Sequence, residues 1–119
     1  MSWILVFLGG GLGSLCRYSI SKLCLSYDGF FPLATLISNI SASLLLAILV
    51  VIFSKKPDLV WLQPLLIIGF CGGFSTFSTF SLENVQLFQQ AQYSWLVGNI
   101  FISLASCFIV LYAVLTLSK

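Results

Sequence analysis

Four long apolar segments make up most of this chain, and they constrain its fold more than any other feature. They are separated by the short stretches YDGFFP, SKKPD and AQYS and run near residues 3–21, 33–53, 64–90 and 96–117. Because a hydrocarbon layer about 30 Å thick takes roughly 20 helical residues to cross, each segment is long enough for one crossing. Of the 119 residues, 60% are hydrophobic and 7% are charged, which is more apolar surface than a small soluble domain can bury. The sequence predicts an all-α integral membrane protein with four transmembrane helices in a single domain, residues 1–119.

The residue types that most enzymes use for chemistry are scarce in this chain. It has no histidine, and its acidic residues are Asp28, Asp58 and Glu83. The four cysteines form no CxxC pair and lie in or beside apolar segments, which is typical of small buried side chains rather than of metal ligands or disulfides. We therefore do not expect an enzyme, and we expect contact with membrane lipid but not with nucleic acid.

The third apolar segment contains the most unusual stretch, GFCGGFSTFSTFSLEN, which spans residues 69–84. Glycines at 69, 72 and 73 are followed by alternating phenylalanines and hydroxyl residues. The pattern indicates a discontinuous helix that is broken at mid-membrane. Non-helical backbone is tolerated at that depth only inside protein or beside a polar cavity, and transporters place ion sites at such breaks. The alternative is a kink that serves only helix packing.

The distribution of basic residues gives little preference for one orientation in the membrane. Lys55, Lys56 and Lys119 share the side of the N-terminus, whereas Arg17 and Lys22 lie opposite. Because cytoplasmic loops normally carry an excess of Lys and Arg, such an even balance is compatible with insertion in both orientations. An antiparallel homodimer is then the expected assembly. The alternative is a single topology set by other features.

Small and polar residues recur at helical spacing on the other three segments. Gly9 and Gly13 form a small-xxx-small pair suited to close helix packing. The second segment carries a polar face of Thr35, Asn39 and Ser43, and the fourth carries one of Asn99, Ser103 and Ser106. An amide at mid-membrane is costly unless it bonds to another helix or faces a wet path. Asn39 could therefore be either an interhelical contact or a ligand.

The stretch at 69–84, together with GGGLGSLCRY at 9–18 and ATLISNISAS at 34–43, closely resembles the Fluc (CrcB) family of small fluoride channels. The resemblance covers essentially the whole chain in the number, spacing and length of its segments. It implies a dual-topology dimer with two antiparallel pores, a central sodium ion and a fluoride path lined by phenylalanines. A homodimer is expected, with a heterodimer of paralogues as the alternative.

The resemblance also implies roles for individual residues. Phe77 and Phe80 match the aromatic positions beside fluoride, and the carbonyls of Gly72 and Ser75 match the structural sodium site. Arg17 matches a vestibule arginine, with snorkelling to lipid headgroups as the alternative. Fluoride is strongly hydrated, so its path must offer donors in place of water. The donors expected along it are Asn39, Ser78, Thr79 and Thr35. The fourth helix offers Phe101, Ser103 and Ser106.

The expected function is passive, fluoride-selective export across a bacterial cell membrane, which gives fluoride resistance. A small multidrug exporter has a similar size and topology, but it needs a glutamate in the first helix, where this chain has none. A non-transporting membrane assembly subunit is the other alternative. Glu83 is expected to have a structural role, paired with Arg17 or Asn84.

Overall fold

Helices account for nearly all of the computed structural model, which describes residues 1–119. In chain order they are α1 (Ser2–Leu23), α2 (Leu33–Lys55), the 3-10 helix η1 (Pro57–Leu62), the π-helix η2 (Pro64–Cys71), α3 (Gly72–Phe74), α4 (Ser78–Gln89) and α5 (Tyr93–Leu117). By length and composition, four stretches can cross a membrane: Ser2–Leu23, Leu33–Lys55, Pro64–Gln89 and Tyr93–Leu117. The predicted set of four long apolar helices is confirmed.

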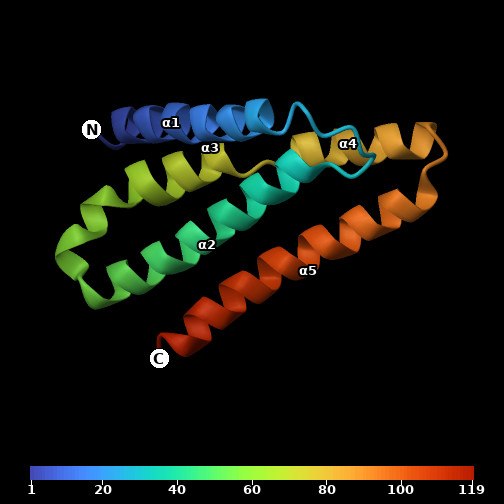
Figure 1. Cartoon of the computed structure of the whole chain (residues 1–119). Helices are drawn as coiled ribbons and strands as arrows, with labels where there is room; N and C mark the ends of the chain where they lie inside the picture. Colours follow the sequence, from blue (N-terminus) through green and yellow to red (C-terminus); the bar gives the residue numbers. More distant parts are fainter.

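The four stretches run back and forth, so that both chain termini lie toward the same end of the molecule (Figure 1). α1 lies along η2 and α3, and α2 lies between this pair and α5. The result is a flattened body of 51 × 32 × 21 Å. α4 continues the line of α3 beyond a short non-helical link and then turns back into α5 (Figure 1).

Close packing of α1 against η2 and α3 depends on glycine. A Cβ atom on Gly9 would collide with the carbonyl oxygen of Leu65, and one on Gly13 would collide with that of Phe70. Gly73 is similarly pressed against the Gly10 carbonyl. The small-xxx-small pair predicted in the first helix is therefore part of a backbone-to-backbone contact.

Few side chains are buried when the chain is considered alone. Only 15 of 119 residues are buried, and the one compact apolar cluster joins Leu49 and Phe53 of α2 to Cys71 of η2. Large apolar side chains on α1 and α5, such as Phe7, Phe101 and Phe108, are exposed. Membrane lipid or another protein chain must cover these surfaces.

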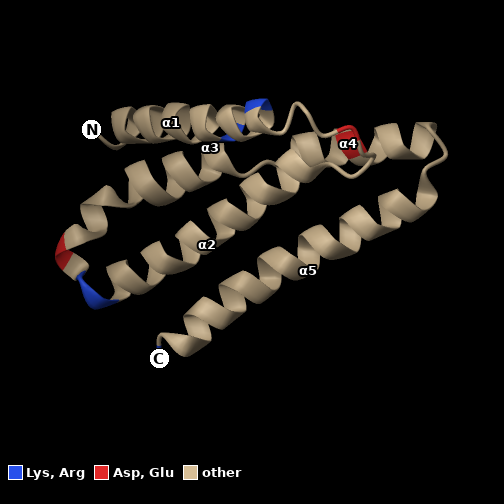
Figure 2. Ribbon diagram, in the orientation of Figure 1, with Lys and Arg blue, Asp and Glu red and all other residues tan.

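Charged residues lie mainly at helix ends and in the turns (Figure 2). Lys22 is in the last turn of α1, and Lys55 is in the last turn of α2 at the opposite end. The long middle parts of the helices are free of charge, as expected of segments that cross hydrocarbon. Arg17, which lies within α1, and Glu83, which lies within α4, are the exceptions.

Residues 75–77 separate α3 from α4 and are not helical. Ser75 has extended backbone with φ −79° and ψ 157°, and α4 begins again at Ser78. The eight residues of η2 before α3 form wide π-helical turns, which in other proteins are often found at functional sites. That this interruption falls at mid-membrane stays a prediction.

Candidate functional site

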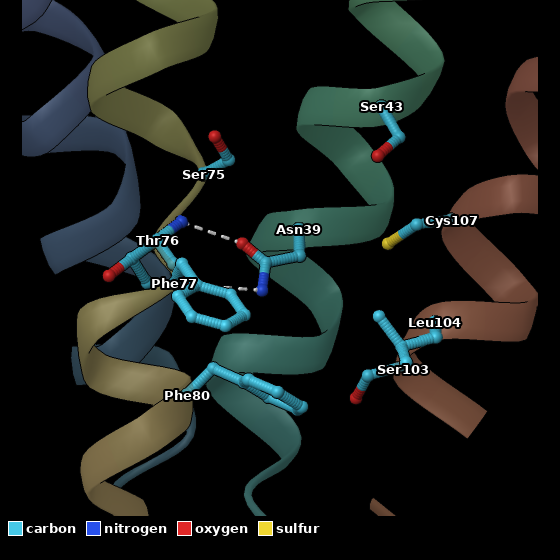
Figure 3. Close-up of a pocket in the computed structure, with 9 residues that line it drawn as sticks. All are labelled: Asn39, Ser43, Ser75, Thr76, Phe77, Phe80, Ser103, Leu104 and Cys107. Carbon is cyan, nitrogen blue, oxygen red and sulfur yellow. Dashed lines mark hydrogen bonds between the residues drawn. The ribbon is translucent and has the colours of Figure 1, made fainter. Parts of the chain in front are cut away.

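A cavity of about 240 Å³ lies beside the non-helical link, between α2 and α5. Its walls come from α2, residues 75–77, α4 and α5 (Figure 3). The lining residues are Asn39, Ser43, Ser75, Thr76, Phe77, Phe80, Ser103, Leu104 and Cys107. The lining contains no charged residue, so any ion in the cavity would contact only amide dipoles, hydroxyls, aromatic rings and other neutral groups.

Asn39 connects α2 to the non-helical link through two hydrogen bonds. The Thr76 backbone N–H donates to Asn39 Oδ1 over 2.8 Å, and Asn39 Nδ2 donates to the Thr76 carbonyl over 3.2 Å (Figure 3). The side-chain amide thus satisfies both backbone groups of a residue that has left the helix. Nδ2 carries two hydrogens, and the second is free to face the cavity. Asn39 is an interhelical contact, and it keeps one donor for a ligand.

Phe77 and Phe80 lie side by side where the cavity meets α4. Their ring centroids are 5.8 Å apart, with the ring planes tilted by 40°. Phe80 is buried, whereas Phe77 is 76% exposed and is therefore available to a ligand or another chain. Because the edge of an aromatic ring is positive, a pair of rings can contact an anion without the strong attraction of a cation.

The α5 wall of the cavity is formed by Ser103, Leu104 and Cys107. Ser103 was identified from the polar face of the fourth segment, but Cys107 was interpreted only as a buried apolar residue. Its spacing of four residues from Ser103 would have indicated the same face. Ser106 does not line the cavity, and its hydroxyl donates back to the helix carbonyls of Ile102 and Ser103. Phe101 is exposed and outside the cavity.

Three residues expected on the ion path lie outside this cavity. The Thr35 hydroxyl donates to Glu83 Oε1 over 2.6 Å, and Thr35 is itself buried. Ser78 is exposed and lies 3.4 Å from the Thr76 hydroxyl, whereas the Thr79 backbone N–H donates to Thr76 Oγ1 over 3.2 Å. Thr76, which the sequence interpretation did not single out, is the shared partner of Ser78 and Thr79.

Glu83 and Arg17 are not paired with each other. Glu83 bonds Thr35 and lines a separate hollow with residues of the 21–34 stretch. Arg17 Nε donates to the carbonyl of Gly73 over 3.1 Å. This bond holds the end of α1 against α3 and leaves the two terminal nitrogens of the guanidinium for other partners.

The carbonyls of Gly72 and Ser75 have lost the donors that a continuous helix would give them. In an α-helix the Gly72 carbonyl accepts from Thr76 N–H and the Ser75 carbonyl accepts from Thr79 N–H. Here Thr76 N–H donates to Asn39 Oδ1, and Thr79 N–H donates to Thr76 Oγ1. Gly72 and Ser75 are both exposed and border one small cavity of about 190 Å³ with Ser43. Their oxygens are thus available to a cation.

Together, these features define a multi-pass helical membrane protein with an uncharged polar cavity beside an interruption in its helices. Residues 4–115 match the family described as CrcB-like protein, Camphor Resistance (CrcB). The chain therefore belongs to the CrcB family, and the resemblance inferred from its motifs is confirmed.

Three bacterial proteins illustrate the similarity. This chain is 40% identical over 106 residues to the fluoride-specific ion channel FluC of Serratia proteamaculans (strain 568), a match covering 87% of this chain and 83% of the relative. It is 41% identical over 108 residues to the protein of the same name from Proteus mirabilis (strain HI4320), covering 89% and 86%. The Escherichia coli FluC (strain K12 / MC4100 / BW2952) is 38% identical over 105 residues, covering 87% and 82%.

Proposed function

We propose that this chain is a passive, fluoride-selective ion channel of the bacterial cell membrane that exports fluoride and gives fluoride resistance. The observation that carries this proposal is the uncharged cavity in which the Asn39 amide and the Phe77–Phe80 pair meet beside the non-helical link. Its family membership and the names of its relatives, which are those of ion channels and not of enzymes, support the same conclusion.

Fluoride would be held in this cavity by neutral donors and ring edges. The second Nδ2 hydrogen of Asn39 replaces part of the hydration shell, and Phe77 and Phe80 present positive ring edges nearby. Thr35, Ser78 and Thr79 lie outside the cavity and would serve the outer parts of the path, with Arg17 raising the anion concentration at its mouth. Neutral donors suit conduction, because an ion held by a full charge would leave slowly.

Passive flow is favoured over proton-coupled exchange. No acidic residue lines the cavity, and α1 has none at all. The first-helix glutamate on which a small multidrug exporter depends is therefore missing. Glu83 is held by Thr35 away from the cavity. An assembly subunit without transport would need neither the paired rings nor an amide with a free donor.

The functional unit we propose is an antiparallel, dual-topology homodimer with two pores; pairing with a paralogue remains the alternative. In each chain, the break between α3 and α4 would lie at mid-membrane. A Cβ atom on Gly72 would meet nothing within 4 Å, so packing inside one chain does not require glycine there. A second chain packed against this surface would explain why position 72 is a glycine and why Phe77 is exposed in the single chain.

A structural sodium ion would sit at the centre of this dimer. Sodium is a hard cation that takes oxygen ligands, and the Gly72 and Ser75 carbonyls are the oxygens whose helical donors are diverted. These residues fit the ion. Bound there, it would neutralise the negative ends of the carbonyl dipoles contributed by both chains.

Efflux from liposomes that contain only this chain tests the proposed function. Vesicles loaded with fluoride should release it rapidly, whereas vesicles loaded with chloride should not, and release should need no proton gradient. Equal release of the two anions, or fluoride release that requires a pH gradient, would reject the proposal.

A further inference from the structure

A hydrogen-bonded chain of three side chains connects α4 to the cavity wall on α5. Asn99 Nδ2 donates to Asn84 Oδ1 over 2.7 Å, and the Ser103 hydroxyl donates to Asn99 Oδ1 over 3.0 Å. Asn99 is 1% exposed and Ser103 is 6% exposed, so water does not compete for the bond between them, whereas Asn84 is half-buried. Ser103 is the member that borders the cavity, whereas Asn84 and Asn99 lie behind it.

The direction of these bonds decides what Ser103 offers to an ion. A serine hydroxyl has one hydrogen, and here Asn99 Oδ1 accepts it. Ser103 therefore has only lone pairs left to offer to the cavity that it borders. Lone pairs repel an anion, so in this state Ser103 cannot help to hold fluoride.

The same three side chains can reverse their bonds without losing any. An amide has an acceptor and a donor on opposite sides, so rotating both amides by half a turn exchanges their roles while their shape stays nearly the same. Asn84 then donates to Asn99, Asn99 donates to the Ser103 oxygen, and the Ser103 hydrogen is released into the cavity. A donor that itself accepts a hydrogen bond is polarised and donates more strongly.

We propose that Asn84, Asn99 and Ser103 form a reversible hydrogen-bond relay, in which an anion in the cavity selects the direction that turns the Ser103 hydroxyl toward it. Asn84 and Asn99 are positioning residues that act through Ser103. The relay rests on the proposed function, because it describes how the same cavity changes from anion-free to anion-binding. It also assigns a role to a buried amide, Asn99, and a half-buried one, Asn84, which would otherwise serve only helix packing.

A double-mutant cycle between positions 84 and 103 tests the relay. An ionised aspartate at position 84 can only accept, so Asn84→Asp fixes the bonds in the direction that withholds the Ser103 hydrogen. Asn84→Asp should lower fluoride efflux by about tenfold more in the protein with Ser103 than in a Ser103→Ala background. A factor of about ten corresponds to the free energy of one hydrogen bond. The direct repulsion between the new charge and fluoride acts in both backgrounds and cancels in the comparison.

Ser106→Ala is the matched control, because the Ser106 hydroxyl donates to backbone carbonyls and has no part in the relay. Asn84→Asp should reduce efflux equally with and without it. If the Asn84→Asp protein does not fold, Asn84→Leu takes its place, and its effect on efflux should disappear in the Ser103→Ala background. The relay would be overturned if the substitution at position 84 reduced efflux by the same factor with Ser103 and in the Ser103→Ala background. It would also be overturned if that substitution had no effect on efflux. Absence of fluoride efflux from the unmodified chain would instead overturn the proposed function.

Discussion

The Asn39 side chain combines a structural contact with a position at the cavity. Its amide bonds both backbone groups of Thr76 and also borders the cavity. An amide is the one neutral side-chain group that can accept from the N–H and donate to the C=O of the same residue and still keep a second N–H. Loss of either function should therefore affect stability and transport together.

Asn39→Asp should lower both stability and fluoride efflux. An aspartate keeps the acceptor for Thr76 N–H but leaves the Thr76 carbonyl without its donor, at a cost of about 1–3 kcal/mol. When ionised, it also places negative charge beside an anion path. Thermal unfolding in detergent and liposome efflux measure the two effects.

Ser38→Ala is the control for this variant. Ser38 is the neighbouring residue, fully buried, and its hydroxyl has no hydrogen-bond partner. Removing that hydroxyl should leave stability unchanged or improve it, and efflux should stay normal. An Asn39→Asp protein that matched Ser38→Ala in both measurements would contradict the role given to the amide.

At the scale of elements, contact between α1 and the η2–α3 stretch depends on which glycines face the partner backbone. A Cβ atom on Gly13 would overlap the Phe70 carbonyl, whereas one on Gly11 would meet nothing within 4 Å. The two positions are in the same helix, two residues apart, and differ in what they face. They form a matched pair for separating packing from helix propensity.

Gly13→Ala should destabilise the protein, and Gly11→Ala should not. Overpacking at a rigid backbone contact costs about 1–3 kcal/mol, while alanine at an open helical position gains up to about 1 kcal/mol over glycine. Unfolding temperatures of the two purified variants measure the difference. Similar values for both would mean that the α1 contact is looser than the structure has it.

The helices could be predicted from the sequence more completely than the cavity could. Length and hydropathy suffice for four apolar helices, because each crossing needs a fixed number of apolar residues. The cavity wall on α5 was only partly predicted, since Cys107 was interpreted as a buried apolar residue although its spacing from Ser103 places it on the same face. The contact between Thr35 and Glu83 joins residues 48 positions apart, and no local pattern indicates it. The backbone N–H groups of Thr76 and Thr79 donate to side chains instead of helix carbonyls. Residue spacing does not predict this, because it depends on where those side chains point.

The whole molecule leaves a large apolar surface that one chain cannot cover. Exposed rings on α1 and α5 suit lipid, whereas the exposed Phe77 and the open position at Gly72 suit a second chain. Basic residues are split three against two between the two ends, with Lys55, Lys56 and Lys119 at one end and Arg17 and Lys22 at the other. Both orientations should therefore be populated.

Cysteine labelling in intact cells tests the two orientations. In a background without the four native cysteines, Lys55→Cys at one end and Lys22→Cys at the other should each be labelled by an impermeant reagent in about half of the molecules. The two ends should give similar fractions. Reciprocal labelling, with one end fully accessible and the other protected, would show a single topology.

The proposed sodium ion should be required for fluoride flux without driving it. In the proposed dimer, carbonyls from both chains would hold the ion in place, so sodium would not travel with fluoride. Efflux should stop when sodium is replaced by a large organic cation on both sides of the vesicle membrane. A sodium gradient that drives fluoride uphill would contradict the structural role.

The central claim is that fluoride passes beside the Phe77–Phe80 pair, and efflux through the double variant Phe77→Ile, Phe80→Ile tests it most directly. Isoleucine keeps an apolar contact but removes the ring edges, and Phe77 is mostly exposed, so stability should change by less than about 1.5 kcal/mol. Fluoride efflux from liposomes should fall by about tenfold or more, the equivalent of losing one such ring interaction. Unchanged fluoride efflux from a well-folded double variant would show that the rings only pack and that the ion takes another path.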